Sequence, residues 1–404
     1  PFHSCRRRCR PARRLNVEPS RATSKLVNED KATRYHRLRR RALLISLCLS
    51  FLLLTVMLLP WSSRALRELT TFSGSIRATS LSGVALYALC VTLCHELLTL
   101  PARVYLRQLE RRYDRSTSSL GSGLAEHLKG MALLLCVIPT GVVALYATIQ
   151  IWPSRWWIIA SSGFALFVVG LAKVGPVMLP WVARVMPLVR PDLRQRLERL
   201  AARAGVADVG FHQYRLGAMS RRANAALVGF GQSRRILLSD TLVGDYSDDE
   251  IEVVVAHELG HHQHADIWKE LASDFVMIVV GCYTASRALL NLGPSLGLFG
   301  PDDPAGLPLV LLGGGVGVLA TAPLANLVSR YHERRADRFA LELTRNTGAF
   351  ISAMWRLGEE HLAERRPSRW LAFLCYTHPP VYERIEAAGN LAAAWGRPLS
   401  TGMR

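Results

Sequence analysis

The stretch Ala256-His257-Glu258-Leu259-Gly260-His261-His262 decides how the whole chain is interpreted, because it contains the pattern H-E-x-x-H. On a helix, His257 and His261 lie four residues apart on one face, where both imidazole rings can bind one zinc ion. Glu258 lies beside them and can reach a metal-bound water without being a ligand. Two nitrogen ligands, an open coordination position and a carboxylate base are parts of a metallopeptidase. Because the pattern also arises by chance, the rest of the chain must supply the remaining parts.

The residues ahead of this stretch predict the helix that it requires. Ser247 followed three residues later by Glu250 is a capping-box pattern, which marks a helix N-terminus. Apolar residues then recur at helical spacing at Ile251, Val254 and Leu259. We therefore expect both histidines to lie on one helix.

Composition and charge indicate a membrane protein. The chain has 404 residues, of which 50% are hydrophobic, a mean hydropathy of +0.16 and a net charge of +19. Residues 1–41 contain fourteen Lys and Arg against three Asp and Glu, directly ahead of an apolar segment. Such a cluster is typical of a topology signal or of a segment that meets anionic lipid, so we expect no nucleic-acid partner. We interpret residues 1–41 as a disordered, basic cytoplasmic tail.

Six apolar segments have about the 20 residues that cross a bilayer. They are Ala42–Pro60, Gly83–Pro101, Met131–Trp152, Trp156–Trp181, Leu271–Leu292 and Leu307–Val328. The fold class predicted is mainly α: a polytopic helical bundle or barrel of six spans, with a small α+β metallopeptidase portion. A seventh span would follow if the helix with the two histidines were partly embedded. The expected domains are the tail 1–41, a four-span region 42–184 and a metallopeptidase domain 185–404 that includes two spans, about 271–292 and 307–328.

The loops favour one orientation of these spans. The tail, the loop 103–129 and the stretches after residues 181 and 328 are rich in arginine, whereas residues 294–304 contain none. Basic loops remain on the cytoplasmic side of a membrane. The sequence therefore predicts that residues 185–270 and 330–404, and with them the site, face the cytoplasm.

The stretch between the fourth and fifth spans predicts a small soluble unit. A charged amphipathic helix is expected over Pro191–Ala204, and short strands over Val206–Tyr214, Ala225–Gly229 and Arg235–Ser239. Asn224 and Ala225 begin a segment that fits an edge strand able to accept an extended peptide. An ordinary strand of a small sheet explains the same residues equally well.

A catalytic zinc site needs a third protein ligand, and Glu333 is the candidate. Glu333 follows His261 by 72 residues, and this interval contains two predicted spans, a hairpin that returns the chain to the same side of the membrane. Asp337 follows Glu333 by one helical turn and can accept the second N–H of a ligating histidine. His332 is the rival ligand, although on a helix it points about 100° away from Glu333. A solvated charged face is the alternative for Glu333 and Asp337, but it leaves the metal one ligand short.

A last motif lies near the C-terminus, where His378-Pro379-Pro380 precedes a helix containing Arg384. Such a turn can serve only to begin the helix, without any further function. If it folds over the metal, His378 or Arg384 can stabilise the oxyanion that forms on a peptide carbonyl.

Together these motifs resemble the integral-membrane CAAX prenyl protease family of zinc metallopeptidases, which is related to the heat-shock protease HtpX. The resemblance rests on H-E-x-x-H at 257–261, S-R-x-x-E-x-x-A-D at 329–337 and H-P-P-x-x-x-R-I at 378–385. It covers residues 80–390 and includes Ala223-Asn224-Ala225 in the substrate-strand region. It implies a membrane helical barrel around a chamber, with one zinc ion per subunit at the cytoplasmic end. By matching positions it implies ligands His257, His261 and Glu333, the base Glu258, and supporting roles for Asn224, Asp337, His378 and Arg384.

We therefore expect a multi-pass zinc endopeptidase of a bacterial plasma membrane, in contact with lipids and acting on peptide or protein substrates, with or without a lipid attached. A heat-shock-type protease that clears misfolded membrane proteins shares this chemistry. An inactive metal-binding scaffold is the alternative of another class. An intact Glu258 counts against the scaffold, because a structural metal site has no use for a base.

Overall fold

Apolar helices make up the first half of the protein. The computed structural model describes residues 21–71, 80–113, 120–182, 185–206, 209–214, 223–229, 234–364 and 366–396. The first helices are α1 (Arg21–Met57), α2 (Pro60–Thr71), α3 (Leu81–Arg112), α4 (Leu120–Ile151) and α5 (Trp156–Val182). The mainly α fold predicted from the sequence is confirmed.

Two further long helices form a hairpin in the second half. They are α9 (Asp266–Leu292) and α10 (Leu307–Thr344), joined through the short turns η3 (Pro294–Leu296) and η4 (Pro304–Gly306). Within the described residues, α1, α3, α4, α9 and α10 contain apolar stretches long enough to cross a membrane. The fourth expected span, Trp156–Trp181, corresponds to α5, which has a shorter described apolar stretch, Trp156–Leu171. α10 continues well past its expected end at residue 328 and carries its polar C-terminal third into the site.

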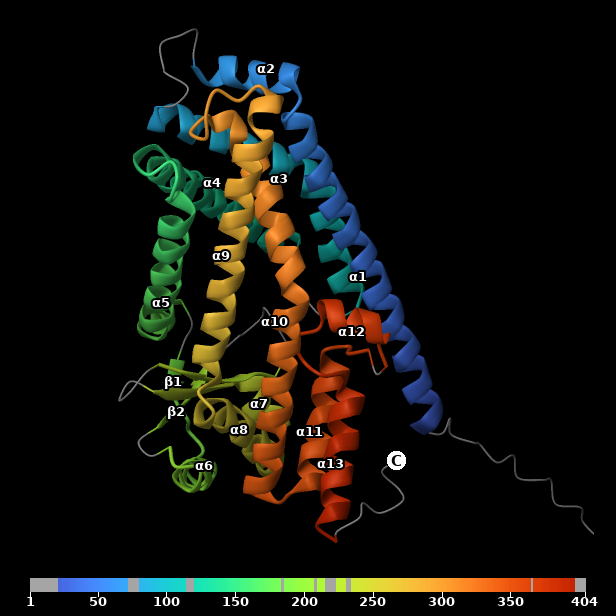
Figure 1. Cartoon of the computed structure of the whole chain (residues 1–404). Coiled ribbons are helices and arrows are strands. Elements are labelled where there is room, and N and C mark those ends of the chain that lie inside the picture. Colours follow the sequence, from blue (N-terminus) through green and yellow to red (C-terminus); the bar gives the residue numbers. More distant parts are fainter. Residues whose placement is uncertain are drawn as a thin grey trace, which may run out of the picture.

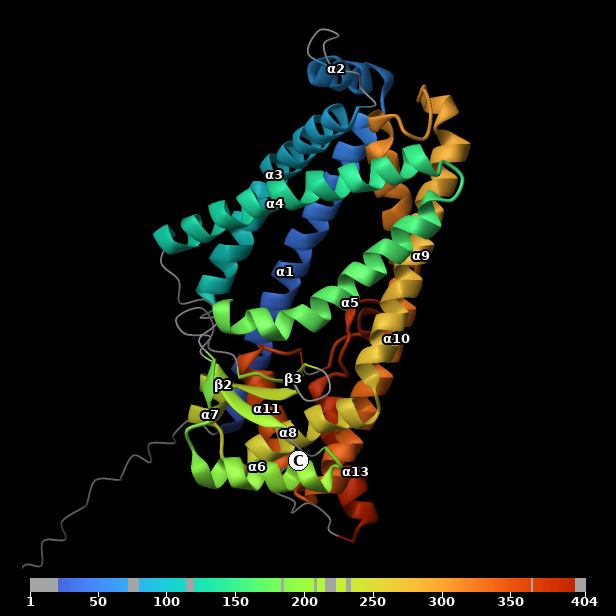
Figure 2. The ribbon, with the colours of Figure 1, turned by 90° about the vertical axis from the view of Figure 1, so that its left-hand side faces the viewer.

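The six apolar helices form a closed ring. α1 contacts α3, α3 contacts α4, α4 contacts α5, α5 contacts α9, α9 contacts α10, and α10 returns to α1. Figures 1 and 2 show the sheet towards one end of these helices and α2 across the other end. This arrangement is the barrel that the sequence predicts.

The N-terminal tail differs from its expected structure. Residues 21–41 are not disordered but form the first part of α1, while residues 1–20 lie outside the described residues. Tyr35 is buried against Leu109 of α3 and Leu362. Composition alone does not reveal such partners, which explains the error: a basic helix with one apolar face becomes ordered when that face is buried.

Small residues let α9 and α10 approach each other closely. A Cβ atom added at Gly313 would lie 2.9 Å from Ala288 Cβ and 3.0 Å from Ala285 Cα, and one at Gly317 would lie 3.0 Å from Gly281 Cα. The spacing of Gly313 and Gly317 is the G-x-x-x-G pattern of closely packed membrane helices. The hairpin that delivers Glu333 thus depends on this contact.

We expect Gly313→Ala to lower the free energy of unfolding by about 1–3 kcal/mol, because the added methyl overlaps the backbone of α9. Gly315→Ala is the matched control, since a Cβ there meets nothing within 4 Å. The free energy of unfolding of Gly315→Ala should equal that of the wild type or be slightly higher, because glycine is a poor helix former. Thermal unfolding of both variants in detergent distinguishes them, and equal melting temperatures would contradict the close contact.

A four-stranded sheet lies between the two halves of the chain. Its strands are β1 (Val185–Pro187), β2 (Gly210–Tyr214), β3 (Ala225–Val228) and β4 (Arg235–Ser239), in the order β1-β2-β4-β3. β2 and β4 are parallel, and the outer pairs are antiparallel. The three predicted strands are present, β1 was not predicted, and β3 is an edge strand.

Six shorter described helices complete the C-terminal portion. They are α6 (Pro191–Arg203), α7 (Asp240–Asp245), α8 (Asp248–Gln263), α11 (Thr347–Glu360), α12 (Arg369–Cys375) and α13 (Val381–Ala394). One apolar core joins the sheet to α6, α8, α11 and α13, and α8 contributes Ile251, Val255 and Leu259 to it. The opposite face of α8 is therefore free to present the two histidines.

Candidate metal centre

The start of α8 is fixed by the predicted capping box. The Ser247 side chain accepts a hydrogen bond from the Glu250 N–H at 3.3 Å, and the Glu250 carboxylate accepts one from the Ser247 N–H at 2.9 Å. Glu250 is buried and also accepts hydrogen bonds from Ser352 at 2.6 Å and Arg356 at 3.1 Å, both on α11. These bonds hold the orientation of α8 relative to the core.

Gly260, between the two histidines, lets α10 come close to α8. A Cβ atom at Gly260 would lie 3.2 Å from the Cα and 3.3 Å from the carbonyl oxygen of Ala336. A larger residue would push α10 outward. The glycine thus places Glu333, less than one turn before Ala336, within reach of the histidines.

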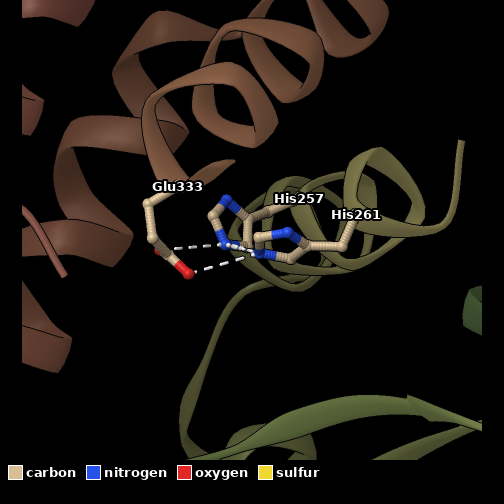
Figure 3. A group of neighbouring side chains, drawn as sticks. All are labelled: His257, His261 and Glu333. Atoms are coloured by element: carbon tan, nitrogen blue, oxygen red, sulfur yellow. Dashed lines mark hydrogen bonds and ion pairs between the residues drawn. The ribbon is translucent and has the colours of Figure 1, made fainter. Parts of the chain in front are cut away.

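His257, His261 and Glu333, which we call the metal triad, converge on one point (Figure 3). The two Nε2 atoms are 3.1 Å apart, and the Glu333 carboxylate oxygens lie 3.5 Å from His257 Nε2 and 3.3 Å from His261 Nε2. Ligand atoms around a tetrahedral zinc ion are about 3.3–3.5 Å apart, given bonds of about 2.0–2.2 Å. The three donor atoms therefore fit one such ion.

The charges of the triad also fit a cation. Glu333 Oε2 is buried and, among the described residues, has no hydrogen-bond partner. Burial opposes protonation of His257, but the carboxylates of Asp337 and Glu333 outweigh it and raise the pKa of this histidine. An excess of buried negative charge around two histidines favours a bound metal ion.

Glu258 lies beside the triad and next to the edge of the sheet. It accepts a hydrogen bond from the backbone N–H of Leu227 in β3, and burial raises the pKa of its carboxyl group. A carboxylate whose pKa is raised toward neutrality is a better general base and a better acid in the following step. Its position suits it to handle protons between a metal-bound water and a peptide.

The structure brings Asp337 and Arg384 to the site as well. Asp337 Oδ1 lies 3.0 Å from His257 Nδ1, the ring nitrogen on the far side from the triad. Arg384 donates from Nε to Asp337 Oδ2 at 2.8 Å. A carboxylate behind a ligating histidine fixes the tautomer and orientation of the ring.

His378 and His332 have different surroundings. His378 Nε2 lies 3.3 Å from Glu333 Oε1, and its side chain is 63% exposed, so it can meet a substrate beside the triad. His332 is buried, and its ring nitrogens face two carboxylates of α9, at 4.0 Å from Asp266 and 3.9 Å from Glu270. The rival third ligand is therefore directed away from the triad.

Sequence reasoning missed one residue of the site. Asp266, at the start of α9, places Oδ2 3.1 Å from His261 Nδ1 and is 1% exposed. It follows His261 by five residues, across a helix end, so no helical spacing connects the two. A carboxylate close in sequence to the second histidine was the only available signal.

A cavity of about 1490 Å³ opens beside the triad. The triad lines it together with Ala225 and Arg384, and so do Asp274 and Met277 of α9 and Leu44 of α1, which belong to apolar helices of the ring. The cavity thus connects the membrane helices with the site, and a chain segment emerging from the membrane region can reach the triad through it.

Among the described residues, no strand pairs with the outer edge of β3; this edge, which we call the free edge, lies beside the cavity at Asn224 and Ala225. The Ser239 N–H donates to the Asn224 carbonyl at 2.9 Å, so these two residues form a hydrogen-bonded pair. In an antiparallel ladder such pairs alternate, which directs the N–H groups of Ala225 and Leu227 away from β4. The Leu227 N–H that reaches Glu258 confirms this register.

A ring of membrane helices with a His-His-Glu triad and a carboxylate at one end defines an integral-membrane metallopeptidase. The chain belongs to peptidase family M48, whose sequence profile matches residues 187–392. A second profile, described as CAAX prenyl protease N-terminal, five membrane helices, matches residues 19–183.

Individual proteins agree with this assignment. The chain is 26% identical over 365 residues to the uncharacterized metalloprotease YhfN of Bacillus subtilis, covering 88% of this chain and 84% of that protein. It is 27% identical over 344 residues to the CAAX prenyl protease 1 homolog of Oryza sativa subsp. japonica, covering 81% and 78%. Its fold is similar to the crystal structure of S. mikatae Ste24p, with a TM-score of 0.77, 19% identity and 89% of each chain covered.

Proposed function

We propose that this metallopeptidase is a zinc endopeptidase in which His257, His261 and Glu333 hold the ion and Glu258 is the general base. The observation that carries the proposal is the convergence of three donor atoms, 3.1–3.5 Å apart, beside a carboxylate whose pKa is raised. Zinc held by these residues would supply Lewis-acid chemistry, polarising the peptide carbonyl and lowering the pKa of a water molecule. Glu258 takes the proton from the water and gives it to the leaving amine.

The surrounding side chains hold the reacting peptide. The exposed His378 side chain, and Arg384 where it lines the cavity, can donate hydrogen bonds to the oxyanion of the tetrahedral intermediate. Asp337 keeps Arg384 and His257 in place from behind. The peptide backbone adds to the free edge of β3, where Asn224 and Ala225 line the cavity.

We expect Ala225→Pro to lower kcat/KM for a peptide by about 10-fold, the effect of losing one hydrogen bond of about 1.5 kcal/mol. Proline removes an N–H that points to the free edge, and edge positions tolerate it. Ala225→Ser retains the N–H and should leave kcat/KM within about 2-fold of wild type, well above the value for proline. If both variants retain wild-type kcat/KM, the substrate does not pair with this edge.

We place the site on the cytoplasmic side of the membrane. The basic part of α1, with Arg34, Arg37 and Arg41, lies at the same end of the ring as the sheet and α8 (Figure 1). Basic residues next to a membrane span remain in the cytoplasm.

The substrate is proposed to be a membrane-associated protein whose C-terminal part is lipidated. The cavity beside the triad joins polar groups with apolar side chains, the exposed Leu43 and Leu44 of α1 and the half-buried Met277 of α9. The match of residues 19–183 to the N-terminal region of CAAX prenyl proteases supports the same substrate class. Clearance of misfolded membrane proteins is the second candidate, since the triad and Glu258 serve either substrate equally.

A cleavage assay on detergent-purified protein distinguishes the two substrates. We would offer a farnesylated C-terminal peptide, the same peptide without the lipid, and an unfolded membrane protein. We expect cleavage of the farnesylated peptide, with a loss of at least 10-fold for the unlipidated one. Cleavage of the unfolded protein alone would establish quality control instead. If none is cut although zinc is bound stoichiometrically, the inactive scaffold becomes the better account.

A further inference from the structure

Among the described residues, Asp266 is the one buried carboxylate next to the triad to which the proposed reaction gives no role. Its Oδ2 atom lies 3.1 Å from Nδ1 of His261, the ring nitrogen opposite the Nε2 atom that faces Glu333 at 3.3 Å. Since Asp266 contacts the back of the ring, it is not a fourth ligand. Any effect of Asp266 on a bound metal would therefore pass through the histidine.

An unusual backbone conformation brings Asp266 to this position. Ala265, between α8 and α9, has φ 53° and ψ 38°, in the left-handed region that alanine rarely adopts. The conformation costs about 1–2 kcal/mol for a residue with a Cβ atom. This residue separates α8 from α9, and the first side chain of α9 lies against His261. Such a cost is retained when the surrounding structure requires the geometry.

The other carboxylate oxygen of Asp266 is occupied. Arg335 of α10 donates to Oδ1, and Lys269 Nζ lies 3.6 Å from the same atom. With Oδ1 engaged by these cations, Oδ2 is left for His261. Arg335 follows Glu333 by two residues on α10. This one helix therefore supplies both a ligand of the triad and the group that holds Asp266.

The same pattern occurs behind the other histidine. His257 is contacted by Asp337, which is held by Arg384, just as His261 is contacted by Asp266, which is held by Arg335. Each ligating imidazole is thus supported by its own carboxylate and each carboxylate by its own guanidinium. The carboxylate behind His257 comes from α10 and is held by α13. The carboxylate behind His261 comes from the junction of α8 and α9.

We propose that Asp266 is a positioning residue of the metal centre. It accepts a hydrogen bond from the Nδ1–H group of His261 and so keeps Nε2 unprotonated and directed at the metal, with Arg335 holding the carboxylate in place. Carboxylates that orient ligating histidines typically change metal affinity by about 10–100-fold. The inference rests on the zinc site proposed above and concerns how tightly that site holds the ion.

The test is the zinc dissociation constant of the full-length protein in detergent, measured by competition with a chelator. We expect Asp266→Ala to raise it about 10–100-fold. Asp266→Asn retains a neutral acceptor of the same shape and should raise the zinc dissociation constant less than Asp266→Ala does. Asp274→Asn is the matched control, since this carboxylate lies two turns along α9 and lines the same cavity without contacting the triad. Its dissociation constant should equal that of the wild type.

The melting temperature of the metal-free protein separates this role from a structural one. If Asp266 only pairs with Arg335, Asp266→Ala and Arg335→Ala should lower that temperature equally and leave zinc binding unchanged, which would overturn the proposal. Should the alanine variant fail to fold, Asp266→Asn decides alone, and an unchanged dissociation constant refutes the role. A wild-type protein that binds no zinc would instead refute the proposed function itself.

Discussion

Glu258→Gln is expected to lower kcat for peptide hydrolysis by about 10²–10⁴-fold, the usual contribution of a general base. The amide has the same shape but cannot take a proton from water. Glu258 is not a member of the triad, so the variant should bind one zinc ion with wild-type affinity. Zinc stoichiometry and kcat measured on the same preparation test both expectations.

Two results would count against this role. If Glu258→Gln retains activity, the base is another group, and if it loses zinc, Glu258 has a structural role in the site. The Leu227 N–H that now donates to Glu258 can also donate to the glutamine oxygen. A change in the fold of β3 is therefore not expected to complicate the comparison.

Glu333→Ala is expected to abolish activity through loss of the metal. The substitution removes the only negatively charged member of the triad and leaves two histidines four residues apart on α8. We expect zinc affinity to fall by more than about 100-fold, beyond the range typical of residues that only orient a ligand. Added zinc should restore little activity, because the remaining ligands do not fix the ion.

The control for this prediction lies on the same helix. Glu342 of α10 is exposed and pairs with Arg338 at 2.8 Å on the outer surface, away from the cavity. Glu342→Ala should leave zinc affinity and kcat unchanged, since exposed ion pairs of this kind contribute little. A Glu333→Ala variant with wild-type zinc content would show that the third ligand is another residue.

Much of this site can be predicted from the sequence because helical spacing is strict. Four residues place His257 and His261 on one face, and the capping box marks where their helix begins. The prediction of Glu333 as the third ligand depended on the fold, because the α9–α10 hairpin must bring this residue back to the two histidines. The choice over His332 rested on the 100° between neighbours on a helix, and the structure places His332 against Asp266 and Glu270.

Other features depend on contacts that no local pattern carries. Asp266 reaches His261 only because Ala265 adopts a left-handed conformation, which the alanine side chain does not favour. The N-terminal part of α1 is ordered by the burial of Tyr35 against α3 and Leu362, although its composition is typical of a disordered segment. In both cases tertiary packing outweighs the local preference of the sequence.

The most direct test of the account is X-ray absorption spectroscopy at the zinc edge of the purified, zinc-loaded protein. We predict a first shell of two imidazole nitrogens and one or two carboxylate or water oxygens, all at about 2.0–2.2 Å, with no sulfur. His257→Ala should remove one of the two imidazole contributions. A sulfur ligand at about 2.3 Å, or a spectrum that His257→Ala does not change, would show that zinc is held elsewhere and would contradict the metal triad.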